Sequence, residues 1–391
     1  MKGGGTSVPP IYFMTHEVFK IINKKHPKLS WVQDRTIFLT LHGSRAYGTN
    51  VEGSDEDFKG VAIPPKEMFF SAYKTFEQVI LDGKDEPDSV IFDIRKFISL
   101  AANANPNILE VLFTEPSDHV LVTPLGQLLL DNKEIFLSKK VRHTFMGYAI
   151  SQMKKMKSHR GWLLTPPDHK PTREEFGLEE KPIIDKEQMS AAFAEIRKEM
   201  DRAQFNFMDH LSEAVKIQIR ESMEEMLSNM KLGTDEQWLG VARSIGFDDN
   251  FIEIMQKERR FLAAKRNFDS YLNWKETRNE KRFKDEEKLH YNAKHAYHLI
   301  RLTRMAEEML TTGKVIVKRP DREELLFIRN GGWTYDQLME YTEKQNDKIN
   351  QLYIHSITLP EHCNLEKVDK LCIQLIEQSF QTPSHQGRCT W

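Results

Sequence analysis

Residues 43–57 read GSRAYGTNVEGSDED, and this stretch decides the fold of the first third of the chain. It follows Thr36–Leu41, a run of β-branched and apolar residues whose length and composition predict a β-strand. Because glycine has no Cβ, Gly43-Ser44 lets the chain turn sharply and brings backbone N–H groups, with the Ser44 hydroxyl, close to phosphate oxygens. The stretch therefore predicts a phosphate-binding turn where a strand ends.

Two aspartates separated by one residue, Asp55 and Asp57, follow this turn. If the chain is extended from Asp55 to Ile63, both carboxylates project from the same face of a second strand. Mg²⁺ prefers one or two protein carboxylates and fills the rest of its octahedron with water and substrate phosphate. The pair therefore predicts a magnesium site beside the phosphate-binding turn.

A third acid is expected, because two-metal phosphoryl or nucleotidyl transfer uses several carboxylates to hold the ions and activate the attacking hydroxyl. Asp93 is the candidate, since it interrupts the apolar run Ser89–Ile94 and an acid in such a strand needs an ion or a partner. Asp88 lies just outside the run and is interpreted as a solvated turn residue. An Asp93 side chain that points away from Asp55 and Asp57, with no pocket shared among the three, would end the enzymatic interpretation.

The Gly-Ser turn, the Ser-Asp-x-Asp element and the later aspartate together resemble the active-site signature of the DNA polymerase β superfamily of nucleotidyltransferases. Each element alone is a weak signal, and their conjunction at this spacing is specific. The resemblance implies a turn that holds the triphosphate and three acids that hold two Mg²⁺ ions, which Mn²⁺ can replace: Gly43 and Ser44, and Asp55, Asp57 and Asp93. Glu56 departs from the pattern, because that position is usually apolar.

Three further segments resemble one branch of that superfamily, the predicted nucleotidyltransferases of bacteria and phages that are sometimes associated with RNA ligases. They are Asn105–Leu112, Trp162–Leu178 and Lys294–Leu302. This resemblance implies an enzyme that moves a nucleoside monophosphate from an NTP such as ATP to a hydroxyl, with an RNA 3′ end as the first choice of acceptor. A protein or small-molecule acceptor stays open, as does a non-catalytic NTP- or RNA-binding module on the same fold.

Further nucleotide-binding residues are expected in two places. Arg45 and Ser54 precede the paired aspartates, and Arg45 is either a triphosphate contact or a solvated residue of the turn. A predicted helix puts Lys294, His298 and Arg301 at i, i+4 and i+7, hence on one face. That face is expected to meet nucleotide or acceptor phosphates, with a merely charged, solvated face as the alternative. A zinc site at His290, His295 and His298 is less favoured, because no cysteine or carboxylate accompanies them.

The composition limits the classes of partner. The chain has 391 residues and a formal net charge of -2, so any nucleic-acid binding must come from a local patch. Lys257–Arg304 mixes basic and aromatic residues and is a candidate RNA surface, although helical spacing favours a packed core for its rings. No apolar run is long enough for a membrane helix, and three cysteines without metal-site spacing favour a reducing, cytoplasmic setting. The oligomeric state is left open.

The predicted fold class is α+β. Residues 1–137 are expected to form the nucleotidyltransferase domain, a mixed sheet with flanking helices, and residues 138–391 a helical domain that forms the other wall of a cleft. The helical part contains a proline-rich loop, 165–182, in which Lys170 and Arg173 either close over nucleotide or only connect helices. Helices are also expected at Asp209–Lys231 and Glu286–Thr311, with a β-hairpin or short extended element at Val315–Arg319. In the N-terminal domain a fourth strand is expected between Phe69 and Leu81.

Overall fold

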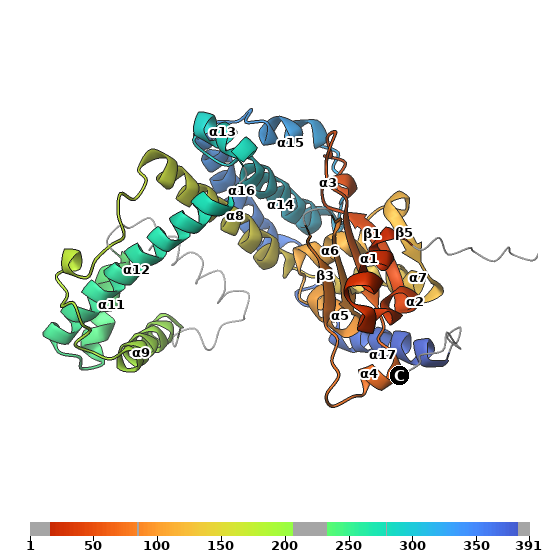
Figure 1. The fold of residues 1–391 in the computed structure, drawn as a ribbon, viewed down its shortest axis with the longest axis horizontal. Helices are drawn as coiled ribbons and strands as arrows, with labels where there is room; N and C mark the ends of the chain where they lie inside the picture. The colour runs from red at the N-terminus through yellow and green to blue at the C-terminus, as the bar shows by residue number, and fades with distance from the viewer. Residues whose placement is uncertain (1–15, 84–85, 206–232, 279, 382–391) are drawn as a thin grey trace, which may run out of the picture. The chain divides into compact units, whose positions relative to one another are not determined.

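A computed structural model describes residues 16–83, 86–205, 233–278 and 280–381 (Figure 1). The chain divides into two compact units. Unit 1 combines residues 1–153 with residues 293–391, and unit 2 comprises residues 154–292. The last hundred residues therefore return to the unit that contains the predicted catalytic stretch.

Unit 1 is built on a five-stranded sheet with the order β3-β4-β2-β1-β5. The strands are β1 Thr36–His42, β2 Asp57–Ala62, β3 Gln78–Leu81, β4 Asp88–Asp93 and β5 His119–Val122. The pair β2–β4 is parallel and the other pairs are antiparallel, so the sheet is mixed. This confirms the predicted α+β fold, in which four of these strands were expected. The short strand β5 was not predicted, because its four residues give no distinct alternation.

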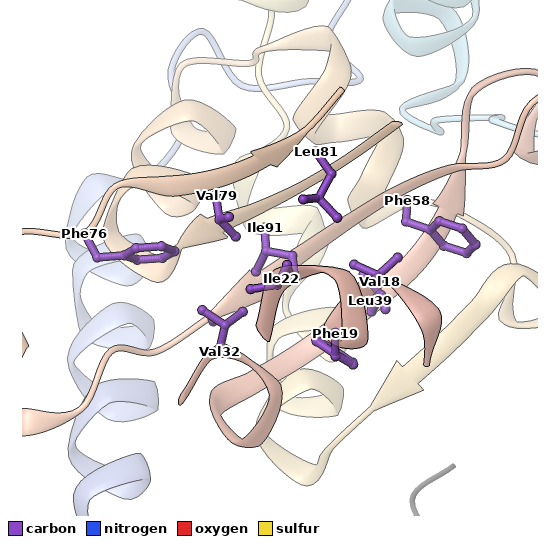
Figure 2. Close-up of a cluster of buried hydrophobic side chains, with 11 residues drawn as sticks. Val18, Phe19, Ile22, Val32, Leu39, Phe58, Phe76, Val79, Leu81 and Ile91 are labelled. Carbon is purple, nitrogen blue, oxygen red and sulfur yellow. The ribbon is translucent and has the colours of Figure 1, made fainter. Parts of the chain in front are cut away.

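One face of the sheet packs against α1 (Glu17–Lys25) and α2 (Trp31–Arg35). Figure 2 shows the cluster, in which Val18, Phe19 and Ile22 of α1 meet side chains from four strands. Leu39, Phe58 and Ile91 are the strand residues at its centre. Because side chains alternate along a strand, their neighbours in sequence point to the opposite face.

The opposite face is packed by helices that follow β4 and β5 in the chain. These are α5 (Ile94–Ala102), α6 (Pro106–Leu112) and α7 (Pro124–Asp131). Phe97 and Leu109 are fully buried there. Shorter elements complete this region: η1 Pro27–Leu29, α3 Gly43–Ala46, α4 Lys66–Phe69, η2 Pro116–Asp118 and η3 Lys133–Phe136.

Four helices from the end of the chain belong to unit 1. They are α14 (Ala293–Thr312), α15 (Arg322–Arg329), α16 (Tyr335–His355) and α17 (Leu365–Gln381). The helix α14 packs against α15 and α16, and α17 packs against α5 and α7. This division differs from the predicted one, which drew a single boundary at residue 137. Sequence periodicity marks helices but does not show which core they join.

Unit 2 is helical where the structure describes it. The long helix α8 (Val141–Leu164) leads into it, and α9 (Lys186–Phe205), α11 (Gly233–Ser244), α12 (Asp249–Thr277) and α13 (Glu280–Leu289) follow. Ile196, Trp238 and Met255 lie in its core. The predicted helix Asp209–Lys231 lies outside the described residues.

Three local predictions in the helical part can be compared with the structure. The loop 165–182 is irregular except for η4 (Glu174–Phe176), and its Arg173 pairs with Glu258 of α12, so this arginine anchors the loop within unit 2. The single helix expected at Glu286–Thr311 is broken between α13 and α14, where His290 has a φ of 57°. The extended element expected at Val315–Arg319 is not a strand.

Among the described residues, no helix combines the length and apolar character that crossing a membrane requires.

Gly126 of α7 tests the packing of this helix against the sheet. A Cβ at this position would lie 2.1 Å from the backbone oxygen of Ile37 in β1. We expect Gly126→Ala to lower the free energy of unfolding by roughly 2 kcal/mol or more, because a backbone atom cannot move aside easily. Gly147→Ala is the matched control: a Cβ in this position of α8 meets nothing within 4 Å. Thermal unfolding should show no loss of stability in the control.

Candidate active site

Three residues lie side by side at one end of three neighbouring strands. β1 ends at His42, and β2 and β4 begin at Asp57 and Asp88. His42 is the Cα partner of Asp57, and Asp57 is the Cα partner of Asp88. Residues paired directly across neighbouring strands point to the same face, so the carboxylates of Asp57 and Asp88 share one side of the sheet.

The Gly43-Ser44 turn lies directly against the carboxylate of Asp57. Gly43 has a φ of +64°, and a Cβ at this residue would lie 1.8 Å from Oδ2 of Asp57. Glycine is needed here both for the backbone angle and for the close approach. The turn opens the short helix α3, whose first N–H groups have no acceptor within the helix. The Gly43-Ser44 turn, which suits an anion, and the Asp57 carboxylate, which suits a cation, are therefore in contact. The sequence predicted that the two would be neighbours.

Like charges gather around Asp57. Burial raises the pKa of the Asp57 carboxyl, and Asp88 and Asp55 raise it further, whereas Lys59 and Lys294 lower it. Asp55 and Asp88 are themselves exposed. Asp57 thus lies among like charges, where a divalent cation would be stabilised.

The prediction that Asp93 completes this group is wrong. Asp93 is the Cα partner of Ala62, at the other end of β2 from Asp57. Five residues of strand separate it from Asp88, a distance of roughly 16 Å. Its Oδ1 accepts hydrogen bonds from the backbone N–H groups of Arg95, at 2.7 Å, and Lys96, and the carboxylate pairs with the Arg95 guanidinium. Asp93 is thus the N-cap of α5, which explains why an acid is buried in an apolar run.

Asp88 occupies the position that was expected of Asp93. Asp88 is exposed, as expected of a solvated turn residue. It is nevertheless the first residue of β4 and the direct neighbour of Asp57 across the parallel pair. The enzymatic interpretation that depended on Asp93 therefore fails, and a catalytic function has to rest instead on Asp88 as the candidate third carboxylate.

The loop between the turn and Asp57 is held by Arg45 and Ser54. The Arg45 guanidinium donates a hydrogen bond to the backbone oxygen of Ser54 and lies 3.4 Å from a carboxylate oxygen of Glu56. The Ser54 hydroxyl accepts a hydrogen bond from the Val51 N–H at 2.9 Å. Both residues thus have contacts that shape the loop, and Glu56, the departure from the family pattern, is the ionic partner of Arg45.

The three predicted residues of α14 have different environments. Lys294 is exposed and near enough to Asp57 to lower the pKa of its carboxyl. His298 is partly buried, and burial, with Arg301 and Lys294 nearby, lowers its pKa. Arg301 is 4% exposed and is committed to a protein partner, so it is not part of an exposed basic face. Of the three, only Lys294 is placed to meet a ligand at the carboxylates.

A buried ionic cluster lies beneath the turn. The fully buried carboxylate of Glu110, on α6, pairs with the Arg301 guanidinium and accepts a hydrogen bond from the Tyr47 hydroxyl. Nε2 of His42 lies 3.5 Å from the same carboxylate. Burial alone would raise the pKa of Glu110, but Arg301, His42 and Tyr47 outweigh it and hold that pKa well below its usual range. Glu110 is therefore an ionised anchor.

The same region ties the turn to the C-terminal helices. The Arg301 guanidinium lies 3.9 Å from the centre of the Tyr47 ring, within the range of a cation–π contact. The hydroxyls of Thr49 and Tyr297 are 2.7 Å apart. The Arg329 guanidinium donates to the backbone oxygen of Thr49. The Gly43-Ser44 turn and the residues after it are thus supported by residues more than 240 positions later in the chain.

The residues at the sheet edge fit a magnesium ion by their chemistry. The carboxylates of Asp55, Asp57 and Asp88 are hard oxygen donors. Because Gly43 lies directly against the Asp57 carboxylate, that carboxylate is beside a turn suited to phosphate. Within the described ranges, however, no three acidic, histidine or cysteine side chains are already close enough to enclose an ion. The fit is therefore to a cation that substrate phosphate and water help to hold.

A mixed sheet with a Gly-Ser turn and aspartates at one edge is the arrangement expected of a polymerase β-like nucleotidyltransferase domain. Residues 14–166 match the family RlaP, described as the RNA repair pathway DNA polymerase beta family. The match includes the turn and all three carboxylates. It supports a polymerase β-like nucleotidyltransferase for this part of the chain.

A similar curated protein comes from Enterobacteria phage T4, where it is named an uncharacterized 38.9 kDa protein in the nrdC-mobD intergenic region. It is 27% identical over 130 residues, which cover 31% of this chain and 38% of the phage protein. The chain therefore matches well under half of that relative. No solved structure matches the chain significantly.

Sequence reasoning missed several residues of this site. Glu110 could have been found, because an acid within the apolar helix Asn105–Leu112 is the same signal that drew attention to Asp93. Asp88 could have been found by aligning the starts of β2 and β4, if their parallel register had been known. No pattern in the sequence identifies Lys59, on which Glu110, Asp88 and Asp57 all act electrostatically.

The lowered histidine pKa values predict how stability depends on pH. His42 and His298 are neutral in the fold, whereas the unfolded chain binds protons on both as the pH falls through about 6.5. Stability is therefore lost on acidification, and we expect the free energy of unfolding to fall between pH 7.5 and pH 5.5 by about 1 kcal/mol for each such histidine.

The contribution of His298 can be isolated by substitution. His298→Gln should lose less stability than the wild type over this interval. Urea-induced unfolding at both pH values measures the difference. Equal losses in the wild type and His298→Gln would contradict the assignment.

Proposed function

We propose that the protein is a Mg²⁺-dependent nucleotidyltransferase that moves a nucleoside monophosphate from an NTP to a hydroxyl group and releases pyrophosphate. The observation that carries the proposal is the contact between Gly43 and the Asp57 carboxylate, which joins a phosphate-binding turn to the carboxylate pair Asp57 and Asp88. The match of residues 14–166 to a polymerase β family supports the same reaction.

In this proposal each part of the site has one task. The N–H groups of the turn and the Ser44 hydroxyl hold the β- and γ-phosphates, so that the α-phosphate lies beside Asp57. Asp55, Asp57 and Asp88 would hold two Mg²⁺ ions, or Mn²⁺ in their place, and the bound ions would neutralise charge on the phosphates. Asp88 is exposed at the edge of the sheet, where an acceptor hydroxyl can approach it and transfer its proton.

The reaction is a single displacement at phosphorus. The acceptor hydroxyl loses its proton, its oxygen forms a new bond to the α-phosphorus, and the bond from that phosphorus to the pyrophosphate oxygen breaks. The protein contributes positioning and charge stabilisation, as is usual in phosphoryl transfer.

We propose an RNA 3′ end as the acceptor. The support is the description of the matching family, which places it in an RNA repair pathway. The basic and aromatic stretch Lys257–Arg304 is a weaker argument, because much of it is packed: Arg278 lies over the rings of Trp274 and Phe283, and Arg301 is buried.

The alternative is a non-catalytic module that binds NTP or RNA on the same fold. One observation favours it, namely that the described carboxylates do not already enclose an ion. The two functions differ in a single result. Incubation with each labelled NTP, Mg²⁺ and bulk RNA gives pyrophosphate if the protein is a transferase, whereas binding without pyrophosphate release favours the module.

The identity of the third acid can be tested by isosteric substitution. We expect Asp55→Asn, Asp57→Asn and Asp88→Asn each to lower Mg²⁺-dependent pyrophosphate release by about 100-fold or more, because each removes a charge that holds the ions. Asp93→Asn should retain most of the turnover, since asparagine is also a good N-cap. Circular dichroism checks that all four variants are folded. Turnover that survives in Asp88→Asn and disappears in Asp93→Asn would refute the assignment.

The approach of the turn to Asp57 gives a second test. Gly43→Ala places a Cβ against Oδ2 of Asp57, so we expect it to displace the carboxylate and to lower pyrophosphate release by about 100-fold. Gly53→Ala is the matched control, because Gly53 also has a positive φ, +77°, but a Cβ there meets nothing within 4 Å. Equal activities of the two variants would show that backbone strain alone, and not the contact with Asp57, accounts for the loss.

A further inference from the structure

Lys59 shares a sheet face with the carboxylates of the candidate site. It lies two residues after Asp57 on β2, so both side chains project from the same side of the strand. The intervening Phe58 points to the opposite face, into the cluster beneath α1 (Figure 2). Thr40 of β1 and Val90 of β4 flank Lys59 across the sheet.

The Lys59 ammonium lies among three carboxylates without contacting any of them. Glu110, Asp88 and Asp57 all act on it electrostatically. Among the residues that the structure describes, none forms a hydrogen bond or an ion pair with Nζ of Lys59. Its three N–H donors thus have no protein acceptor, although the side chain is partly buried.

A purely structural role explains this arrangement poorly. The charge of Glu110 is already balanced by Arg301, which contacts it directly. Among the described residues, Nζ of Lys59 is not one of the buried polar atoms that lack a hydrogen-bond partner, so water can bond it in the free protein and a substrate oxygen can replace that water. The position therefore suits an acceptor that arrives with the substrate.

We propose that Lys59 is a catalytic residue whose ammonium donates hydrogen bonds to a phosphate oxygen of the NTP, beside Asp57. The inference rests on the proposed function, because it takes the α-phosphate to lie at the carboxylates. Lysine is a compact charge with three rotatable donors, which suits the changing geometry of a phosphorus centre during displacement. The Lys59 ammonium would then stabilise the charge that develops on the phosphate oxygens.

The test compares three variants with the wild-type full-length protein. Lys59→Met keeps the length of the side chain and removes the charge, Lys59→Arg restores a charge, and Lys66→Met removes an exposed lysine as the control. We expect Lys59→Met to lower kcat/KM for pyrophosphate release by about 100-fold and Lys59→Arg to recover part of it. Lys66→Met should match the wild type.

A second measurement uses the wild-type protein and does not depend on how a variant folds. Lysines are acetylated with and without Mg²⁺ and a non-hydrolysable ATP analogue, and the modified positions are determined by mass spectrometry. The proposal expects the nucleotide to protect Lys59 and not Lys66.

The outcomes separate the two proposals. Protection of Lys59 without pyrophosphate release would refute the transferase function and support the phosphate contact. Normal release by Lys59→Met, with no protection of Lys59, would overturn the inference and leave the transferase function standing. A wild-type protein that binds no NTP would overturn both.

Discussion

The buried ion pair between Glu110 and Arg301 is the interaction on which the site depends. It joins α6, which packs under the sheet, to α14, which the chain adds almost two hundred residues later. Removing one partner of such a pair leaves an uncompensated charge in the interior, at a cost of about 3–5 kcal/mol. Because the Tyr47 hydroxyl donates to the same carboxylate and Nε2 of His42 lies 3.5 Å from it, the pair also supports both ends of the Gly43-Ser44 turn.

Much of the N-terminal fold was predictable because its signals are local. The strands β1, β2 and β4 and the turn at Gly43 follow from β-branched runs, alternation and glycine, and each lies within a few residues of its predicted position. The association of the C-terminal helices with this unit was not predictable. It is decided by single buried contacts such as Thr49 to Tyr297, which leave no periodic pattern in the sequence.

The structure places the predicted Gly43 turn beside Asp57, as expected, but places Asp93 at the other end of the strands. An acid within an apolar run has two physical explanations, a bound cation or a bond to backbone N–H groups, and the sequence alone does not separate them. At Asp93 the explanation is a helix N-cap, and at Glu110 it is an ion pair. Asp88 carries no such signal because it is exposed, and only the register of β2 and β4 places it beside Asp57.

Unit 2 is a single insertion between the two chain segments that form unit 1. Within unit 1, Gln152 near the exit of the chain and His295 near its return lie side by side, with Oε1 and Nδ1 2.8 Å apart. A segment that leaves and re-enters at one point can be lengthened, shortened or exchanged without moving the strands that carry the aspartates. Evolution is therefore free to alter residues 154–292 while the chemistry of the remaining unit is inherited unchanged.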